Sequence, residues 1–260
     1  MATIIGNETH SQILDRDFIS QFRYHSSIKF ESHVNFEALE NKAKMLGVSV
    51  KRLNNTLAII VDEYKNVIAI SSGQWELADK STGLFSDLQF KSINLCGVDT
   101  SKVTDMSHLF YACVATQINL LSFDTSNVID MSGMFEGCMV KGLNLSKFDT
   151  SNVIDMSWMF NRCVAEYIDL SNFNTSKVTN MSHMFSECGV SNLDLSNFNT
   201  SEVENMCRMF DSCRVKSLNI SSFNTNKVID MRGIFGNCMA KIDVTDSQLN
   251  NILIHRDPMY

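Results

Sequence analysis

Proline is nearly missing from this sequence, and so are long apolar runs. The single proline is Pro258, in a chain of 260 residues, so other residues must make the turns. No apolar stretch is long enough to cross a membrane. The N-terminus also lacks a basic region followed by an apolar run, which is the mark of a secretory leader. We therefore expect a cytoplasmic protein that has no membrane partner.

Clusters of Lys and Arg are missing as well. The chain has 22 basic and 29 acidic residues, and its formal net charge is −7. Nucleic acids and anionic membranes are bound by basic patches, so both are poor candidate partners. The mild acidity mainly favours solubility, and a basic protein partner is the alternative.

Motifs for catalysis and for metal binding are also missing. The sequence has no glycine-rich phosphate loop and no nucleophile elbow. A zinc pair of His183 with Cys188 or Cys207 is disfavoured, because the repeated cysteines are expected to face inward and the histidine outward. We expect no catalytic residue, no metal and no cofactor.

What the sequence does have is a repeat of 25 residues, in which Met, Phe and Cys return at fixed spacing. The repeated cysteines are Cys113, Cys138, Cys163, Cys188, Cys213 and Cys238. The phenylalanines of one series are Phe110, Phe135, Phe160, Phe185, Phe210 and Phe235. A period of this length indicates stacked structural units rather than one closed core. We therefore predict a solenoid.

Each unit reads as a strand, a turn and a short helix. In residues 118–142, Ile118 and Leu120 flank Asn119, which is the alternation of a strand. A polar cluster at 124–126 can hold a turn without glycine or proline. Asp130 then stands where a helix N-cap belongs, before apolar residues at the spacing of a helix face. Those residues are Met131, Met134, Phe135 and Cys138.

Stacking such units predicts an α/β repeat solenoid with parallel strands. Helices need about 10 Å of lateral room and strands only about 4.8 Å, so the array should curve into a horseshoe with its strands inside. We assign residues 81–244 to this solenoid. Residues 245–260 form a C-terminal cap and tail, with a short helix after Asp246.

The first 80 residues predict a small α+β module that caps the solenoid or binds a partner. A strand is expected at 27–30 and a helix at 35–45. The β-rich runs 56–61 and 66–71 predict a hairpin.

The repeat resembles that of the BspA-type leucine-rich-repeat surface proteins. The motif is Leu-Asp-Leu-Ser-Asn-Phe-Asn-Thr-Ser followed by Val-x-x-Met and Met-Phe-x-x-Cys, and it is clearest at 168–188 and 193–213. The resemblance implies a leucine-rich-repeat-like fold and a role in adhesion or protein binding, and it transfers no catalytic residue. This chain departs from the family in its 25-residue unit, against about 26. We also expect it to lack the surface-display segments of that family.

The repeated cysteines are expected to be buried free thiols, since helices would hold their Cα atoms beyond the roughly 7 Å limit for a disulfide. Cys207 replaces a serine of the other units and should be exposed. A polar series is expected to form a structural ladder of side chains that satisfy one another, rather than a calcium site. Its members are Asn94, Asn119, Asn144, Asp169, Asp194 and Asn219.

Residues that vary between the units are free to meet a partner. Trp158 stands out, because an exposed indole is costly for solubility and typical of binding hot spots. The alternative is that it lies flat on its neighbours and contacts no partner. Tyr167 precedes a strand, so the strand side is a second candidate surface. The candidate partner-binding residues are His108, Tyr111, Trp158, Arg162, Tyr167, His183 and Arg208.

These observations favour a non-catalytic scaffold that occupies an intracellular protein partner. A viral antagonist of a host complex is one concrete version. A surface-displayed adhesin is the first alternative, and it requires a leader or an anchor. An enzyme with its chemistry in the N-terminal module is the second.

Overall fold

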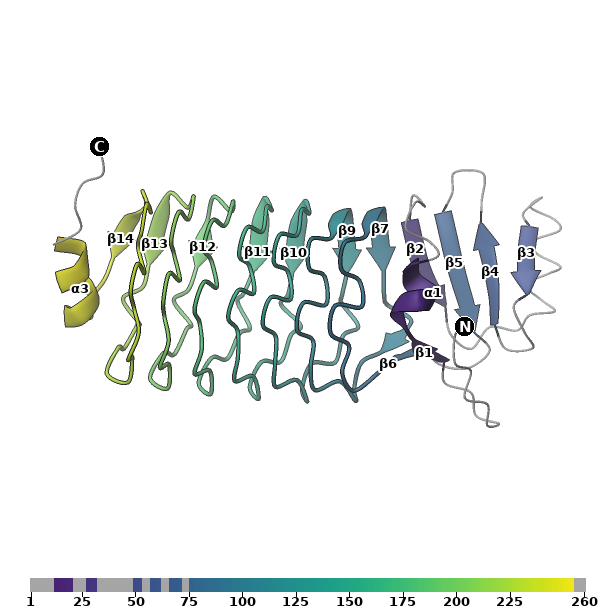
Figure 1. Cartoon of the computed structure of the whole chain (residues 1–260), viewed down its shortest axis with the longest axis horizontal. Coiled ribbons are helices and arrows are strands. Elements are labelled where there is room, and N and C mark those ends of the chain that lie inside the picture. Colours follow the sequence, from purple (N-terminus) through teal and green to yellow (C-terminus); the bar gives the residue numbers. More distant parts are fainter. Residues whose placement is uncertain are drawn as a thin grey trace.

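The computed structural model describes residues 12–20, 27–31, 49–52, 57–61, 66–71 and 75–254. Within them the chain winds into a parallel β-solenoid of about 7 turns, which we call coils. Figure 1 shows the coils stacked in a nearly straight row. The repeat solenoid predicted from the sequence is therefore confirmed.

Short parallel strands define one side of the coils, and most pair in register at the repeat period. In the pairing of β10 with β11, Leu143 lies opposite Ile168. Leu218 of β13 lies opposite Ile242 of β14, so the last strand arrives one residue early, as the sequence predicts. The strands of the solenoid are β7 (Gln89–Asn94), β8 (Val98–Asp99), β9 (Val114–Asn119), β10 (Gly142–Asn144), β11 (Tyr167–Asp169), β12 (Leu193–Asp194), β13 (Ser217–Asn219) and β14 (Lys241–Asp243).

The N-terminal strands continue the sheet of the solenoid. β2 pairs in parallel with both β5 and β7, and the sheet order is β3-β4-β5-β2-β7-β9. The predicted hairpin is confirmed, because β4 and β5 pair antiparallel. The strand β3 was not predicted, and the helix predicted at 35–45 lies outside the described residues. The elements are β1 (Gln12–Leu14), α1 (Arg16–Ser20), β2 (Ser27–Glu31), β3 (Ser49–Arg52), β4 (Leu57–Val61), β5 (Asn66–Ser71) and β6 (Trp75–Leu77).

The short helix predicted in every unit is wrong, since residues 75–246 contain no helix. A row of tight turns takes its place. The amide of Gly133 donates to Ser157 O of the next coil at 2.8 Å, whereas the amide of Met134 donates to Met131 O at 3.2 Å. This alternation repeats along the segment, and left-handed backbone at Gly133 (φ 60°) and Gly137 (φ 64°) is incompatible with a helix.

Asp130 accordingly caps a turn rather than a helix. Its Oδ1 accepts the amide of Ser132 two residues on, at 2.8 Å. The horseshoe prediction fails for the same reason. With extended backbone and turns on every side, each coil needs only about 4.8 Å of stacking distance all round, so nothing forces the array to curve.

Like side chains stack in columns through the core. The rings of Phe110 and Phe135 lie 5.5 Å apart and 3° from parallel, and the next pairs repeat this geometry. The six repeated cysteines are buried thiols that form no disulfide, as predicted. The reason given for that prediction is wrong, because stacked coils bring the Cα atoms of a column to about 4.8 Å, well inside the bridging limit. Cys207 is half-exposed and Cys96 is exposed.

A buried threonine column ties each coil to the next. Thr150 Oγ1 donates to Asn174 O at 3.0 Å and accepts the amide of Asn174 at 2.8 Å.

The polar series that begins at Asn94 does not form the ladder that was predicted. Each Oδ1 accepts the amide two residues later in its own coil, as Asn144 does from Ser146 at 3.1 Å, so these side chains hold turns instead of bonding to one another.

Candidate functional site

Left-handed backbone marks one long face of the solenoid, which we call the turn face. It is formed by two columns of residues with φ between 49° and 64°. For a residue with a side chain this conformation costs about 1–2 kcal/mol, whereas glycine adopts it freely. The first column is Gly83, His108, Gly133, Trp158, His183, Arg208 and Gly233, and the second is Asp87, Ala112, Gly137, Arg162, Glu187, Ser212 and Asn237.

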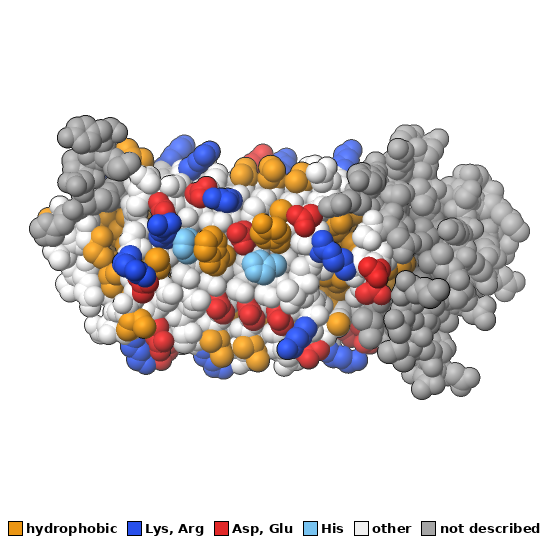
Figure 2. Space-filling model, in the orientation of Figure 1, with side chains coloured by type: hydrophobic (Ala, Val, Ile, Leu, Met, Phe, Trp, Pro, Cys, Tyr) orange, Lys and Arg blue, Asp and Glu red, His pale blue; other side chains and the backbone are white. Residues whose placement is uncertain are grey.

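Trp158 and His183 form the centre of the turn face. Their rings stack with centroids 3.8 Å apart and 9° between the planes, and Trp158 keeps 38% of its surface exposed. Both backbone amides donate to carbonyls of the next coil at 2.9 Å. Figure 2 shows the two described histidines beside hydrophobic side chains in the middle of this face. The indole lies flat on its neighbour and is also open to solvent.

His183 is held in its neutral form at neutral pH. Burial lowers the pKa of its imidazole, the positive charge of Arg208 lowers it further, and Asp211 opposes this effect. The stack on Trp158 is therefore a contact between two uncharged rings. Arg208 extends over Gly233, where an added Cβ would lie 3.2 Å from the Cγ of Arg208.

Arg162 makes a bidentate ion pair with Glu187 of the next coil. The Nε–Oε2 and Nη2–Oε1 distances are 3.1 and 2.9 Å. Hydrogen bonds from Arg162 lower the pKa of the Glu187 carboxyl, so the pair stays charged over the physiological range. Because both side chains are exposed, the pair orients Arg162 more than it stabilises the fold.

His108 and Tyr111 extend the turn face toward the N-terminus. The two rings meet edge to face with centroids 5.7 Å apart. The imidazole of His108 lies over Gly133, where an added Cβ would come within 2.3 Å of its Nδ1. His108 Nδ1 is 3.6 Å from Glu136 Oε2. Burial raises the pKa of Glu136, while His108 and Arg162 oppose that rise.

Tyr167 lies apart from the other predicted residues. It begins β11 and covers Gly142 of the preceding coil, where an added Cβ would lie 2.2 Å from the tyrosine ring. It borders a separate depression of about 480 Å³ together with Gln117, Leu121 and Lys141. The structure thus places six of the seven candidates on the turn face and one on the strand side.

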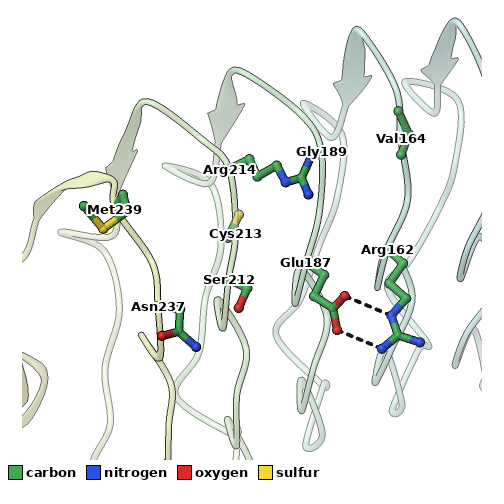
Figure 3. A pocket seen from close by; sticks show the side chains of 9 residues that line it. All are labelled: Arg162, Val164, Glu187, Gly189, Ser212, Cys213, Arg214, Asn237 and Met239. Carbon is green, nitrogen blue, oxygen red and sulfur yellow. Dashed lines mark hydrogen bonds and ion pairs between the residues drawn. The ribbon is translucent and has the colours of Figure 1, made fainter. Parts of the chain in front are cut away.

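A hollow beside the turn face escaped the sequence analysis. It has a volume of about 690 Å³, and Figure 3 shows the side chains that line it. One wall is the column of which Arg162 and Glu187 are members, and the other contains Val164, Gly189 and Arg214. The sequence could have indicated this hollow through Gly189, because the other units have a larger residue at the equivalent position. Those residues are Val114, Met139, Val164, Arg214 and Met239.

Within the described ranges, no group of three His, Cys, Asp or Glu side chains could hold a metal ion. None of the helices described is long and apolar enough to cross a membrane. The candidate site therefore consists of exposed aromatic and imidazole rings, of arginine side chains and of a hollow. All of them lie on coils that are hydrogen-bonded to one another.

The repeat region matches the model of one protein family, described as "Mycoplasma protein of unknown function, DUF285". The matches cover residues 80–166 and 139–248, which together make up more than half of the chain. The chain belongs to this family. The DUF285 matches contain both the turn face and the hollow, and they fit the BspA-type resemblance loosely. No curated protein and no solved structure matched the chain.

Proposed function

We propose that this DUF285 protein is a non-catalytic scaffold that binds a protein partner on its turn face. It acts by steric occupancy, covering a surface of the partner with a pre-formed face of its own. The partner in this proposal is an intracellular protein. A finer version, in which the scaffold blocks a host complex on behalf of a virus, is supported by the repeat resemblance alone.

The observation that carries the proposal is the placement of Trp158. Its backbone is left-handed (φ 60°), and the same column contains glycine at 133 and 233. The fold therefore accepts glycine here, and the indole is kept at a conformational cost of about 1–2 kcal/mol. Backbone strain of this kind is concentrated at functional sites. An indole that is half-open to solvent, with arginines on the same face, is also the composition of a binding hot spot.

The rigidity of the scaffold supports the same function. Every described coil is bonded to the next through backbone amides along the turns and through the threonine column. A surface that is already ordered loses little conformational entropy when a partner binds, so more of the contact energy remains as affinity.

The test is affinity capture from a host lysate with quantitative mass spectrometry. The variants are Trp158→Ala and, as a matched control, Leu121→Ala, which removes another exposed apolar side chain (54% exposed) outside the turn face. We expect Trp158→Ala to reduce recovery of the partner about tenfold or more, as loss of a hot spot of about 2 kcal/mol predicts. The control should capture as the wild type does. Equal capture by both variants, or no capture by the wild type, would contradict the proposal.

A further inference from the structure

We propose that the hollow at Gly189 receives an extended segment of a partner protein, with a carboxylate side chain on Arg214 and an apolar side chain against Val164. This rests on the proposed function and specifies the chemistry of the partner. Three features support this proposal: the origin of the hollow, the arginine beside it and the apolar groups at its rim.

The hollow exists because one side chain is missing from a column. Gly189 is not in the left-handed region, so its backbone does not require glycine. An added Cβ would find its nearest neighbours, Val164 Cγ2 and Cys163 O, at 3.5 and 3.6 Å, which is ordinary contact. Neither backbone conformation nor packing therefore explains this glycine. Its structural effect is to open a space one coil wide between Val164 and Arg214.

Arg214 supplies a positive charge at this space that belongs to no ion pair among the described residues, although it also lowers the pKa of the nearby Glu187 carboxyl, where Arg162 is the larger cause. Its side chain is exposed, and in the part of the chain that the structure describes no carboxylate lies within ion-pair distance of it. Figure 3 shows its guanidinium directed toward Gly189 and away from Met239. The other arginine of the hollow, Arg162, is already paired with Glu187. An entering carboxylate would thus meet Arg214, whose planar guanidinium suits bidentate binding.

Apolar side chains lie on both sides of the cation. Val164 is 52% exposed and Met239 is 82% exposed. Val164 and Arg214 are two coils apart, or roughly 10 Å. Two side chains on the same side of an extended segment are roughly 7 Å apart, so an acidic residue and an apolar residue at positions i and i+2 can reach both contacts.

A protein segment is favoured over a small molecule by the position of the hollow. Arg162 belongs both to its lining and to the turn face, so the two surfaces are continuous. A partner seated on Trp158 and His183 would bring further chain to the hollow. A small carboxylic acid has no such second contact.

The test is an NMR titration of the full ¹⁵N-labelled chain with blocked peptides. The probe is Ac-Ser-Leu-Ser-Glu-Ser-NH2, with a Gln-for-Glu peptide and a Ser-for-Leu peptide as its comparisons. The reporters are the amide of Gly189 and the Nε–H of Arg214. Isovalerate is titrated separately, as a small molecule with the same two groups.

We expect the Leu-Glu probe to shift both reporters with an affinity at least fivefold higher than either comparison peptide. Gly189→Val, which restores the side chain found at position 164, should abolish the shift without loss of stability. Arg214→Gln, in which only the amide of Gly189 remains as a reporter, should also abolish the shift of that amide. Lys147→Gln, which removes an exposed lysine on another surface, should leave it unchanged.

Three results would overturn the inference: no shift with the Leu-Glu probe, equal shifts with the Gln peptide, or tighter binding of isovalerate than of the peptide. The proposed function fails separately. If Gly189→Val and Arg214→Gln capture the lysate partner as the wild type does while Trp158→Ala does not, the scaffold function stands and the hollow has no part in it.

Discussion

Asp246 closes the threonine column by accepting hydrogen bonds from Thr225. The amide and the hydroxyl of Thr225 both donate to its carboxylate, at 3.0 and 2.9 Å. In earlier coils a threonine hydroxyl bonds to the backbone of the following coil instead. The same carboxylate accepts the amides of Gln248 and Leu249 at the start of α3 (Ser247–Ile254). One side chain therefore ends the coils and begins the helix that covers them.

Replacing this carboxylate should loosen the C-terminal end. Asp246→Ala removes a helix cap worth about 1 kcal/mol and leaves the buried hydroxyl of Thr225 without its acceptor, for a total loss of about 2–3 kcal/mol. Hydrogen exchange should accelerate in α3 and in the last coil before the rest of the solenoid. Asp243→Ala, at an exposed carboxylate in β14, is the control and should change exchange little. Unchanged protection of α3 in Asp246→Ala would contradict the capping role.

The same carboxylate predicts part of the acid sensitivity. Burial alone would raise the pKa of Asp246, but bonds from Leu249, Thr225 and Gln248 outweigh it and hold the pKa below its ordinary value. A lowered folded pKa means that the stabilisation is complete above the ordinary pKa of about 3.9 and is lost as the pH falls through the folded value. Denaturation measured between pH 6 and pH 2 should therefore show a smaller acid-induced loss in Asp246→Asn than in the wild type. If stability falls with pH equally in the two proteins, Asp246 does not contribute to the acid sensitivity.

Two glycines with equal space around them should respond in opposite ways to alanine. The nearest atom to an added Cβ is 3.6 Å away at Gly137 and 3.5 Å away at Gly189, but only Gly137 is left-handed, with φ 64°. Gly137→Ala should lower the free energy of unfolding by about 1 kcal/mol. Gly189→Ala should raise it by about 0.4–1 kcal/mol, because it restricts the unfolded chain. Denaturant unfolding of both variants tests this, and a change of the same sign in both would refute the backbone argument.

The sequence was sufficient to predict the solenoid, its columns and the N-terminal hairpin. A 25-residue period places Phe110 above Phe135 and Cys138 above Cys163 whatever the local backbone, since residues one period apart occupy equivalent places in stacked coils. The pairing of β4 with β5 followed from ordinary strand patterning.

The local backbone of each unit could not be predicted in the same way. The inward positions Met131, Met134, Phe135 and Cys138 have helical spacing, but a row of tight turns also directs these side chains inward, and all four are fully buried. Periodicity reports which side chains are buried and not which hydrogen bonds join the backbone. The predictions of a helix in every unit and of curvature depended on that second property, and both failed, whereas the helix predicted after Asp246 is confirmed as α3.

Most of the candidate site followed from comparing the units with one another. Variable positions identified Trp158 and His183, although nothing in the sequence showed that their rings stack. The hollow at Gly189 was missed because this glycine is unusual only in comparison with its column, in which Val164 and Arg214 are the neighbouring residues. That column lies next to the buried Cys213 along the chain, and the sequence analysis made no prediction of where its side chains point.

The buried cysteines should resist alkylation in the folded protein. Burial and neighbouring thiols raise the pKa of Cys188 to about 12 and that of Cys213 to about 11, so almost no reactive thiolate forms at pH 8. Native labelling with iodoacetamide should modify Cys96 first and the half-exposed Cys207 more slowly. Mass spectrometry after proteolysis measures this, and labelling in denaturant, where all eight thiols should react, is the control. Rapid native labelling of Cys188 would show that the column is open.

The environment of His183 should be visible in its titration. Burial and the charge of Arg208 lower the pKa of its imidazole, so NMR of the imidazole protons should show a midpoint below the ordinary value of about 6.5. Arg208→Gln removes one of the two causes and should move the midpoint upward. Asp211→Asn removes the opposing negative charge and should move it downward. Assignment by His183→Asn keeps the signal separate from that of His108. A midpoint at or above the ordinary value, or shifts of the same sign in both variants, would mean that His183 is not confined between Trp158 and Arg208.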